Sequence, residues 1–324
     1  MIVTQRPNFW MDKLSQRVTE RFGAGPQEVV DYVALVNSAT GVAGTPTAAF
    51  AAANLLHDLA CAIQGMPAPV IRALQDRLLG VYFVRELGSS AITDVVVDEN
   101  GNILGSVVAL DLEAFLSRRA NEWATWKENM PFSSKKLMTL EVEIAEPGDD
   151  TRANAIQFLL LHEFGHVLTA GQRFLPIWWL PPESMTSSSD YEFLQLGWQI
   201  TAEKRIVPKP EEDFAGREMV SYYRDAHLDD DAMLAIYRRL QRTSFASLYA
   251  ATNAYDDFAE TFAGYVHSVL MKRPSRLRIC RGAVVAHEAE NFWGSSRSAP
   301  KRAFLKQLLA AFDAPASGLA DHPA

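Results

Sequence analysis

The chain is poor in cysteine and in positive charge, and each shortage excludes a class of protein. Its two cysteines, Cys61 and Cys280, lie far apart in sequence, and neither belongs to a Cys-x-x-Cys pair. A disulfide-stapled secreted scaffold is therefore not indicated, and both cysteines are expected to be small buried apolar residues. The formal net charge of -8 argues against nucleic acid or an anionic membrane as the main partner.

Long apolar runs are also missing. The longest small, apolar stretch covers residues 34–63, and polar residues and a proline interrupt it, so it fails as a membrane span. The first ten residues lack the apolar core of a signal peptide. With 48% hydrophobic and 22% charged residues the composition is that of an ordinary globular protein. We therefore expect a cytoplasmic protein, with export that needs no cleaved signal left open.

The apolar periodicity changes near residue 80. Before it, segments 29–36, 47–63 and 70–79 have helical spacing, so residues 1–79 are expected to form an N-terminal helical region. After it, the β-branched segments 81–84, 92–97 and 103–110 predict strands. An Asn-Gly pair between the last two is typical of a tight hairpin. A helix over 112–127 and a strand over 137–144 are expected next.

The most informative motif is His162-Glu163-Phe164-Gly165-His166, inside a segment that reads as one continuous buried helix. Two histidines four residues apart lie on the same helical face, so both imidazoles can bind one metal ion. Glu163, one step round, can face a water on that ion. Asp149 to Thr151 offer an N-cap, and Gly171 a stop. The alternative is that these histidines are ordinary packed side chains of a core helix.

A catalytic zinc usually needs a third protein ligand, and no third histidine follows at the expected spacing. The best carboxylates are Asp256 and Glu260, which share one face of a helix that begins near an Asn253 cap. One of them can bind the metal while the other accepts a hydrogen bond from a ligating histidine. Glu183, Glu192 and Glu203 are further candidates by distance along the chain, but each lacks a paired acid.

The two motifs together resemble the catalytic domain of the anthrax lethal factor family and related gluzincin peptidases. The second family motif is a helix of pattern N-x-x-E-x-F-A-E, similar to the segment from Asn253 to Glu260. The resemblance implies that Asp256 binds Zn²⁺, that Glu260 supports it, and that Tyr249 donates a hydrogen bond to the oxyanion. This chain has Asp256 where the family usually has Glu, so Glu260 stays an alternative ligand.

The resemblance also implies an α+β, helix-dominated fold, with a zincin-like small mixed sheet followed by the motif helix and a helical C-terminal subdomain. We expect a metallopeptidase domain over 80–275 and a helical tail over 276–324. The expected parts of that domain are a sheet at 80–145, the motif helix at 151–170, inserted helices at 175–245, and the second ligand helix at 253–272. Within the insertion, helices are expected around 191–204, 211–224 and 229–242.

These features predict a zinc-dependent peptidase that acts on a protein or peptide substrate. Zinc held by His162, His166 and Asp256 would activate a water, and Glu163 would be its general base. Tyr255 is an alternative to Tyr249 as the oxyanion donor. The competing interpretation is a zinc-binding regulatory or partner-binding protein with a peptidase-like fold. The sequence leaves the oligomeric state open.

Three other features are expected to be structural. His267 is expected to be packed or exposed rather than part of the site, His227 is expected at the surface, and His287 has no visible partner. The paired Trp178 and Trp179, which stand between prolines, are expected to cover the core or to form a lid rather than to bind a ligand.

Overall fold

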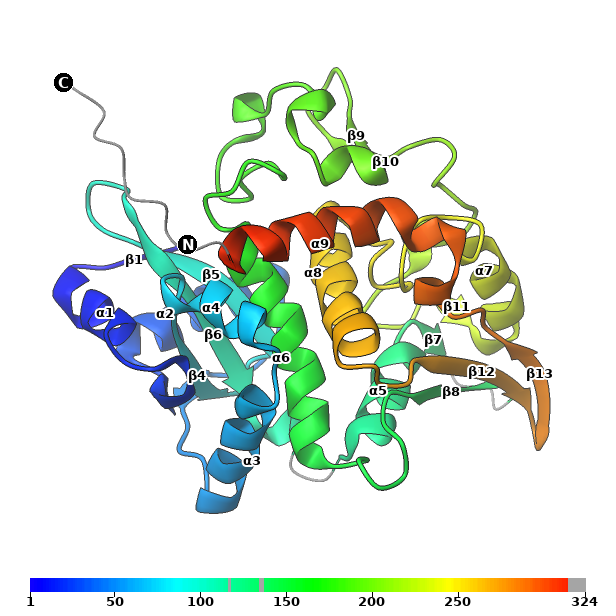
Figure 1. The fold of residues 1–324 in the computed structure, drawn as a ribbon, viewed down its shortest axis with the longest axis horizontal. Coiled ribbons are helices and arrows are strands. Elements are labelled where there is room, and N and C mark those ends of the chain that lie inside the picture. Colours follow the sequence, from blue (N-terminus) through cyan, green and yellow to red (C-terminus); the bar gives the residue numbers. More distant parts are fainter. Residues whose placement is uncertain (116–117, 134–136, 314–324) are drawn as a thin grey trace.

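The computed structural model describes residues 1–115, 118–133 and 137–313, which form a mixed α/β fold (Figure 1). Its longest helices are α6 and α9, and the site predicted above lies on α6 and α8. The α-helices of the described residues are α1 (Pro7–Leu14), α2 (Gln27–Thr40), α3 (Ala53–Gln64), α4 (Ala68–Gln75), α5 (Ala120–Asn129), α6 (Arg152–Thr169), α7 (Met233–Leu240), α8 (Ala254–Gly264) and α9 (Ala299–Asp313).

The largest sheet has six strands in the order β1-β5-β6-β4-β2, with β3 pairing β4. Strand β5 runs antiparallel to β6, whereas β4 runs parallel to β6. The predicted strands and the tight hairpin are confirmed, and the carboxylate of Asp98 accepts two backbone N–H groups in that turn. The strands are β1 (Ile2–Val3), β2 (Phe22–Ala24), β3 (Thr47–Ala48), β4 (Leu78–Arg85), β5 (Ala91–Val97) and β6 (Ile103–Asp111).

Helices cover both faces of this sheet because its central strands are apolar on both sides. Phe83 of β4 faces the core that contains α6, whereas its neighbour Tyr82 faces α1 and α2. On that second face Trp10 of α1 contacts Tyr82 edge-on, with ring centroids 5.7 Å apart. Figure 1 shows α1 and α2 on one side of the sheet and α6 on the other. Helix α6 is thereby fixed between the sheet and α8.

The N-terminal expectation was only partly right. Helices α2, α3 and α4 are confirmed, but residues 1–79 also supply β1, β2, β3 and the start of β4. Strand β1 pairs with β5, and β2 and β3 pair with β4, so the expected boundary at residue 79 runs through one sheet. The strands pair because backbone N–H and C=O groups that helices bury need hydrogen-bond partners. The helix expected over 112–127 is wrong in its bounds. A 3₁₀ turn covers Leu112–Phe115, and α5 starts at Ala120.

The expected single sheet over 80–145 is wrong, because its last strand joins a different sheet. Strand β8 (Thr139–Glu143) pairs with β12 (Arg276–Arg281), which pairs with β13 (Val284–Glu288). The expected helical tail therefore begins with a hairpin; two 3₁₀ turns follow, and α9 is the one α-helix among its described residues, 276–313. The burial of Ile279 and Cys280 in β12 and the ion pair of Arg276 with Glu143 across the strands favour this pairing. Residues 314–324 lie outside the described range.

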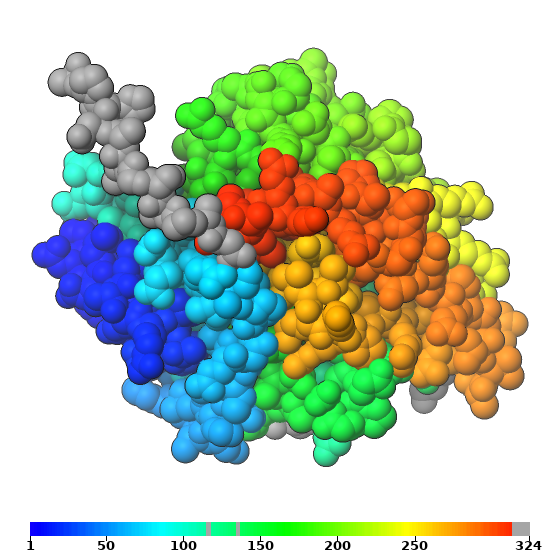
Figure 2. Space-filling model, viewed as in Figure 1, coloured from blue at the N-terminus to red at the C-terminus, as the bar shows by residue number. Residues whose placement is uncertain are grey.

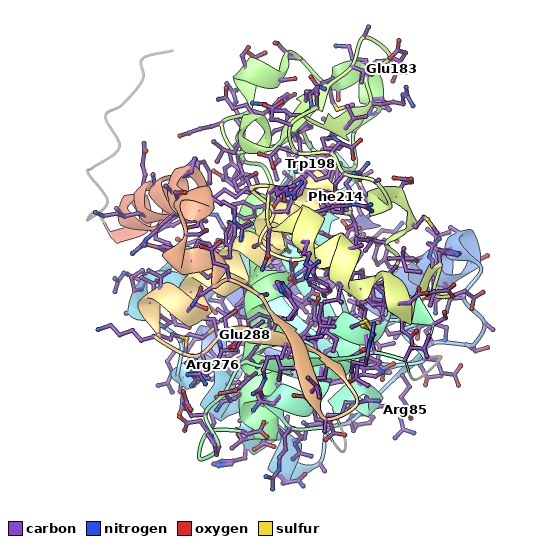
Figure 3. The ribbon with its side chains drawn as sticks, turned by 90° about the vertical axis from the view of Figure 1, so that its right-hand side faces the viewer. Arg85, Glu183, Trp198, Phe214, Arg276 and Glu288 are labelled. Atoms are coloured by element: carbon purple, nitrogen blue, oxygen red, sulfur yellow. The ribbon has the colours of Figure 1, made fainter. Side chains whose placement is uncertain are left out.

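The expected inserted helices are mostly wrong. Only the last of the three is confirmed, by α7. The segments 191–204 and 211–224 hold short 3₁₀ turns instead of helices. A hairpin of β9 (Trp198–Ile200) and β10 (Ile206–Pro208) begins in the first segment and ends between the two. Lys204, Gly216 and Tyr223 have positive φ angles of 58°, 90° and 59°, which a right-handed helix does not allow, and Pro208 and Pro210 between the two segments remove backbone donors. Figures 2 and 3 show this segment as a separate layer above α9, with Glu183 at its outer end. A further short pair joins β7 (Phe132–Ser133) to β11 (Leu228–Asp229).

The remaining expectations concern cysteine and the membrane. Cys280 is buried, but Cys61 is exposed on α3, so the prediction of two buried cysteines is wrong for Cys61. The helix periodicity that buries Leu59 and Ile63 turns Cys61 outward.

Within the described residues, no helix has both the length and the apolar character needed to cross a bilayer.

His267 is packed in the interior, which was one of the two expected outcomes. Its burial should make the stability of the fold depend on pH. It lies in the π-helical turn Tyr265–Leu270 after α8, is 1% exposed, and contacts the ring of Phe158 edge-on. Burial lowers the pKa of His267 from 6.5 to about 4. Between these values the unfolded chain takes up a proton that the folded chain does not. We therefore expect the stability that His267 supplies to be lost as pH falls from 6.5 through 4, by roughly 3 kcal/mol in all.

The measurement is the free energy of unfolding of the metal-free protein at several pH values, with wild type compared with His267→Gln. The wild-type advantage should shrink as the solution is acidified. The exposed His227, changed in the same way, is the control and should give no such trend. An advantage that stays constant from pH 7 to pH 4 would contradict the expected linkage.

Candidate metal centre

Helix α6 has the predicted cap and is buried along most of its length. The side chain of Thr151 accepts a hydrogen bond from the backbone N–H of Asn154, which starts the helix, and Gly171 follows its end with a φ of 70°. His162 and Glu163 are each 4% exposed. His166 is partly open. The helix therefore carries polar groups into the interior, where they need partners.

Helices α6 and α8 approach closely at a point set by two small residues. A Cβ atom added to Gly165 would lie 2.7 Å from the Cα of Ala259 on α8, so only glycine fits there. This contact stands between His162 and His166 on one helix and between Asp256 and Glu260 on the other. The close approach thus brings the four polar side chains within reach of one another.

Gly165→Ala tests this contact. We expect it to destabilise the fold by about 1–3 kcal/mol, because the added methyl meets backbone rather than a movable side chain. Gly148→Ala is the matched control, since a Cβ there meets no atom within 4 Å. Chemical denaturation of both variants gives the comparison. Equal stability of the two would mean that the helices can separate without cost.

The two motif histidines and Asp256 converge on one point. Nε2 of His162 lies 3.2 Å from Nε2 of His166, and Oδ1 of Asp256 lies 3.7 and 3.4 Å from these two atoms. Two zinc bonds of about 2.05 Å at the tetrahedral angle span about 3.3 Å. Within the described residues these three form the one group whose spacing suits a metal ion. The donor set fits zinc.

Residues at the N-terminal end of α8 hold the side chain of Asp256 in place. Asn253 caps α8 by accepting the backbone N–H groups of Tyr255 and Asp256, and its side-chain nitrogen donates to Oδ2 of Asp256 at 2.5 Å. Thr252 also donates to Oδ2, at 3.3 Å. Since these donors engage Oδ2, Oδ1 is left facing the two histidines.

Glu260 has a different position, one turn deeper. Its Oε1 accepts from Nδ1 of His162 at 2.8 Å and from Nζ of Lys127 at 2.6 Å, while Oε2 accepts from the hydroxyl of Ser247 at 2.7 Å. A donating Nδ1–H leaves the Nε2 lone pair of His162 free for a metal. Both Glu260 oxygens are occupied, so this geometry favours Asp256 as the third ligand.

The charges in this cluster shift one another's pKa values. Burial alone would lower the pKa of His166, but its hydrogen bond with Asp256 and the negative charge of that residue outweigh burial and raise the pKa. Burial raises the pKa of Asp256, and the hydrogen bond and charge of His166 overcome this and lower it. For Glu260, the charge of Lys127 and the hydrogen bond from His162 overcome burial and hold the pKa well below its usual range. The acids are thus anionic and ready to face a cation.

Glu163 points toward the sheet rather than toward α8. Its Oε2 accepts a hydrogen bond of 2.6 Å from the hydroxyl of Thr93, and the Glu163 backbone oxygen lies 3.3 Å from the same hydroxyl. Thr93 is on β5, so this bond ties the motif helix to the edge of the sheet. It also fixes the direction of the carboxylate.

Tyr249 lies flat against His162, with ring centroids 5.3 Å apart and ring planes 6° apart. Burial, followed by the charge of Asp256, raises the pKa of Tyr249 well above 10, so its hydroxyl remains a proton donor. The ammonium of Lys127 lies 4.8 Å from the same ring. The alternative donor, Tyr255, also borders the site.

A pocket of about 290 Å³ opens over the histidines. The motif residues, Tyr249 and Tyr255 form its base, and Trp178 and residues 91–93 of β5 form its sides. Trp178 thus borders the site, and its ring contacts Tyr255 edge-on. Strand β1 pairs with Val96 and Val97 alone, so the first part of β5 has an unpaired outer edge within the described residues.

Sequence reasoning missed Thr93, Lys127 and Ser247. None belongs to a motif. Thr93 and Lys127 reach the site from elements that are distant in sequence, whereas Ser247 lies 13 residues before Glu260 in a segment without regular structure, where no helical or strand pattern marks it. The reserve candidates Glu183, Glu192 and Glu203 are exposed and lie outside the cluster. His227 is exposed as expected, and His287 is half-buried outside the cluster.

Comparisons of the chain with protein-family models, with curated proteins and with solved structures found no match. The resemblance to gluzincin peptidases therefore rests on the residues of the two sequence motifs alone.

Proposed function

We propose that this protein is a zinc-dependent peptidase, with His162, His166 and Asp256 as the metal ligands and Glu163 as the general base. The observation that carries the proposal is the convergence of one carboxylate oxygen and two imidazole nitrogens within 4.8 Å of one another. They come from two helices 90 residues apart in the chain, between His166 and Asp256. Chance packing of core histidines gives no reason for such a donor set.

The surroundings support a peptide as the substrate. The open edge of β5 borders the pocket and can pair with an extended backbone, as sheet edges do in other peptide-binding proteins. The antiparallel β5 beside a motif helix also suits the zincin-like arrangement that the family resemblance implies. Trp178 and Tyr255 offer an apolar wall for a substrate side chain.

Zinc, when bound, supplies a Lewis acid that lets water act as a nucleophile near neutral pH. Glu163 then accepts the proton of the attacking water and returns it to the leaving amine. Thr93 keeps this carboxylate directed at the reaction, and Tyr249 donates its hydroxyl proton to the oxyanion in a hydrogen bond. Glu260 and Lys127 act indirectly, because they orient His162.

Metal analysis combined with a cleavage assay tests the proposal. We expect about one zinc ion per chain, cleavage of members of a peptide library, loss of cleavage with a chelator, and recovery when zinc is restored. Zinc without cleavage of any peptide would favour the alternative of a zinc-binding regulatory protein. A chain that binds no zinc would overturn both.

A further inference from the structure

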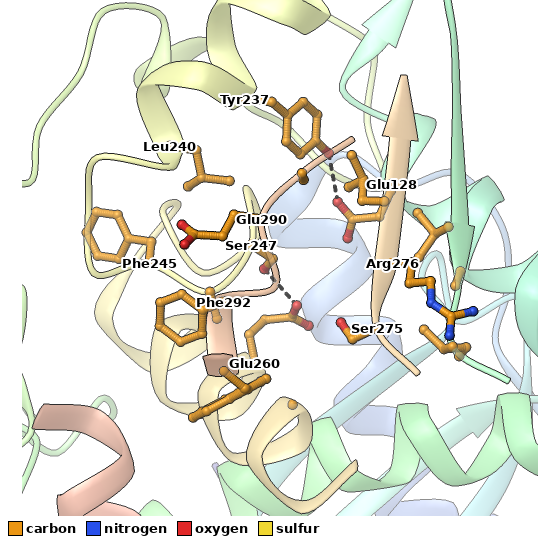
Figure 4. A pocket seen from close by; sticks show the side chains of 18 of the residues that line it. Glu128, Tyr237, Leu240, Phe245, Ser247, Glu260, Ser275, Arg276, Glu290 and Phe292 are labelled. Carbon is orange, nitrogen blue, oxygen red and sulfur yellow. Dashed lines mark hydrogen bonds between the residues drawn. The ribbon is translucent and has the colours of Figure 1, made fainter. Parts of the chain in front are cut away.

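A second cavity, of about 130 Å³, lies behind α8. It shares Lys127 and Glu260 with the surroundings of the metal centre, but none of the three metal ligands lines it. Its walls come from α5, α6, α7, α8, β8, β12 and the segments around residues 245 and 292 (Figure 4). Six aromatic rings contribute to these walls, from Trp123, Phe158, Tyr237, Phe245, Phe292 and Trp293.

The buried end of this cavity holds two acidic side chains and one ammonium group. Glu128 and Glu260 are 8% and 6% exposed, and the ammonium of Lys127 is bonded to Glu260. Glu128 accepts hydrogen bonds from the hydroxyls of Tyr222 and Tyr237, at 3.2 and 3.1 Å, but it forms no ion pair within the described residues. Two acidic groups therefore share one cation in a region of low dielectric, and burial together with the charge of Glu260 raises the pKa of Glu128 despite the nearby Lys127.

The cations at the outer end are already neutralised. Arg276 is about half exposed and pairs with Glu143 at 2.5 Å. Arg297 lies 3.8 Å from Glu290 and donates to the backbone oxygen of Thr243 at 2.9 Å. Neither guanidinium pairs with Glu128, so within the described residues this acid has no cation of its own; Figure 4 shows it together with Glu260.

We propose that this cavity binds a small organic cation, an ammonium group carried on one apolar ring, with the ammonium against Glu128. A cavity of about 150 Å³ holds a benzene molecule. This cavity is slightly smaller, at about 130 Å³, but it opens to the surface beside the half-exposed Arg276, so a ring with one substituent can extend into that opening. Aromatic walls attract cations as well as apolar rings. The proposal stands apart from the peptidase function, because it concerns binding alone. An occupant would also touch Glu260, which connects the cavity to His162.

Calorimetric titration of the full chain, with chelator present to keep amines off the metal centre, tests the proposal. The probes are benzylamine, benzyl alcohol and benzoate, which share one ring and differ in charge. We expect saturable binding of benzylamine, at least about 10-fold tighter than either other probe, because the buried carboxylate favours an ionised donor. Benzyl alcohol or benzoate binding as tightly as benzylamine would overturn the proposal, as would no binding of benzylamine.

Two variants locate the binding. Glu128→Gln keeps the shape and should weaken benzylamine at least about 10-fold without weakening benzyl alcohol. Ala289→Leu, at a half-buried position in the lining, should fill the cavity and weaken both. Glu183→Gln, on the exposed segment, is the control and should bind like wild type. Unchanged benzylamine binding in Glu128→Gln and in Ala289→Leu would place the amine elsewhere and contradict the proposal.

Discussion

Glu163→Gln should lower the rate of peptide cleavage by about 100-fold to 10,000-fold while leaving zinc bound, because general acid–base catalysis contributes that range. Glutamine has nearly the same shape and can still accept the hydrogen bond from Thr93, so the pocket keeps its form. It cannot take a proton from water. The loss should appear in the turnover number, and it is measured with a peptide that the wild type cleaves.

The matched control is Glu183→Gln, an exposed change on the segment above the site that should cleave like wild type. Zinc content and circular dichroism of Glu163→Gln show whether the fold and the metal are retained. If a variant with normal zinc content still cleaves at more than about a tenth of the wild-type rate, Glu163 is not the general base.

Asp256→Ala should weaken zinc binding more than any other single change among the acids. Removal of a direct ligand should cost more than the roughly 10-fold to 100-fold that loss of an indirect partner costs. The carboxylate also balances the two imidazoles, and its Oδ1 is the oxygen that faces both of them. Competition with a chromophoric chelator measures the affinity.

Glu260→Gln is the comparison that separates the two acids. We expect it to weaken zinc about 10-fold to 100-fold, because His162 loses its charged partner but keeps a hydrogen-bond acceptor. A larger loss for Glu260→Gln than for Asp256→Ala would exchange the two roles. Glu183→Ala controls for a general effect of removing negative charge.

Much of the candidate site could be predicted because its signals are local. The histidines and Glu163 share one turn and a half of helix, and helical geometry alone places both imidazoles on one face. The Asn253 cap and the spacing of Asp256 and Glu260 are equally local, and the structure has both. The strands β4 to β6 were predictable for a similar reason, because β-branched runs and the Asn-Gly turn act within a few residues.

Other parts could not be predicted because their causes are not local. Strand β8 has the same pattern whether it joins the main sheet or β12, and the cross-strand partners that decide this lie more than 130 residues away. The segment 175–245 has spaced apolar residues that suggest helix. Its prolines and glycines, together with burial against α8 and α9, produce turns instead.

The amino-acid sequence by itself determined which residues could bind a metal and that one rigid helix presents two of them together. Tertiary structure decided which acid faces the imidazoles and which supports one of them from behind. It did so through the Gly165–Ala259 contact, which sets the depth of α8, and through Lys127 and Ser247, which engage Glu260. Contacts between distant elements depend on how whole surfaces pack, and no short stretch of residues encodes them.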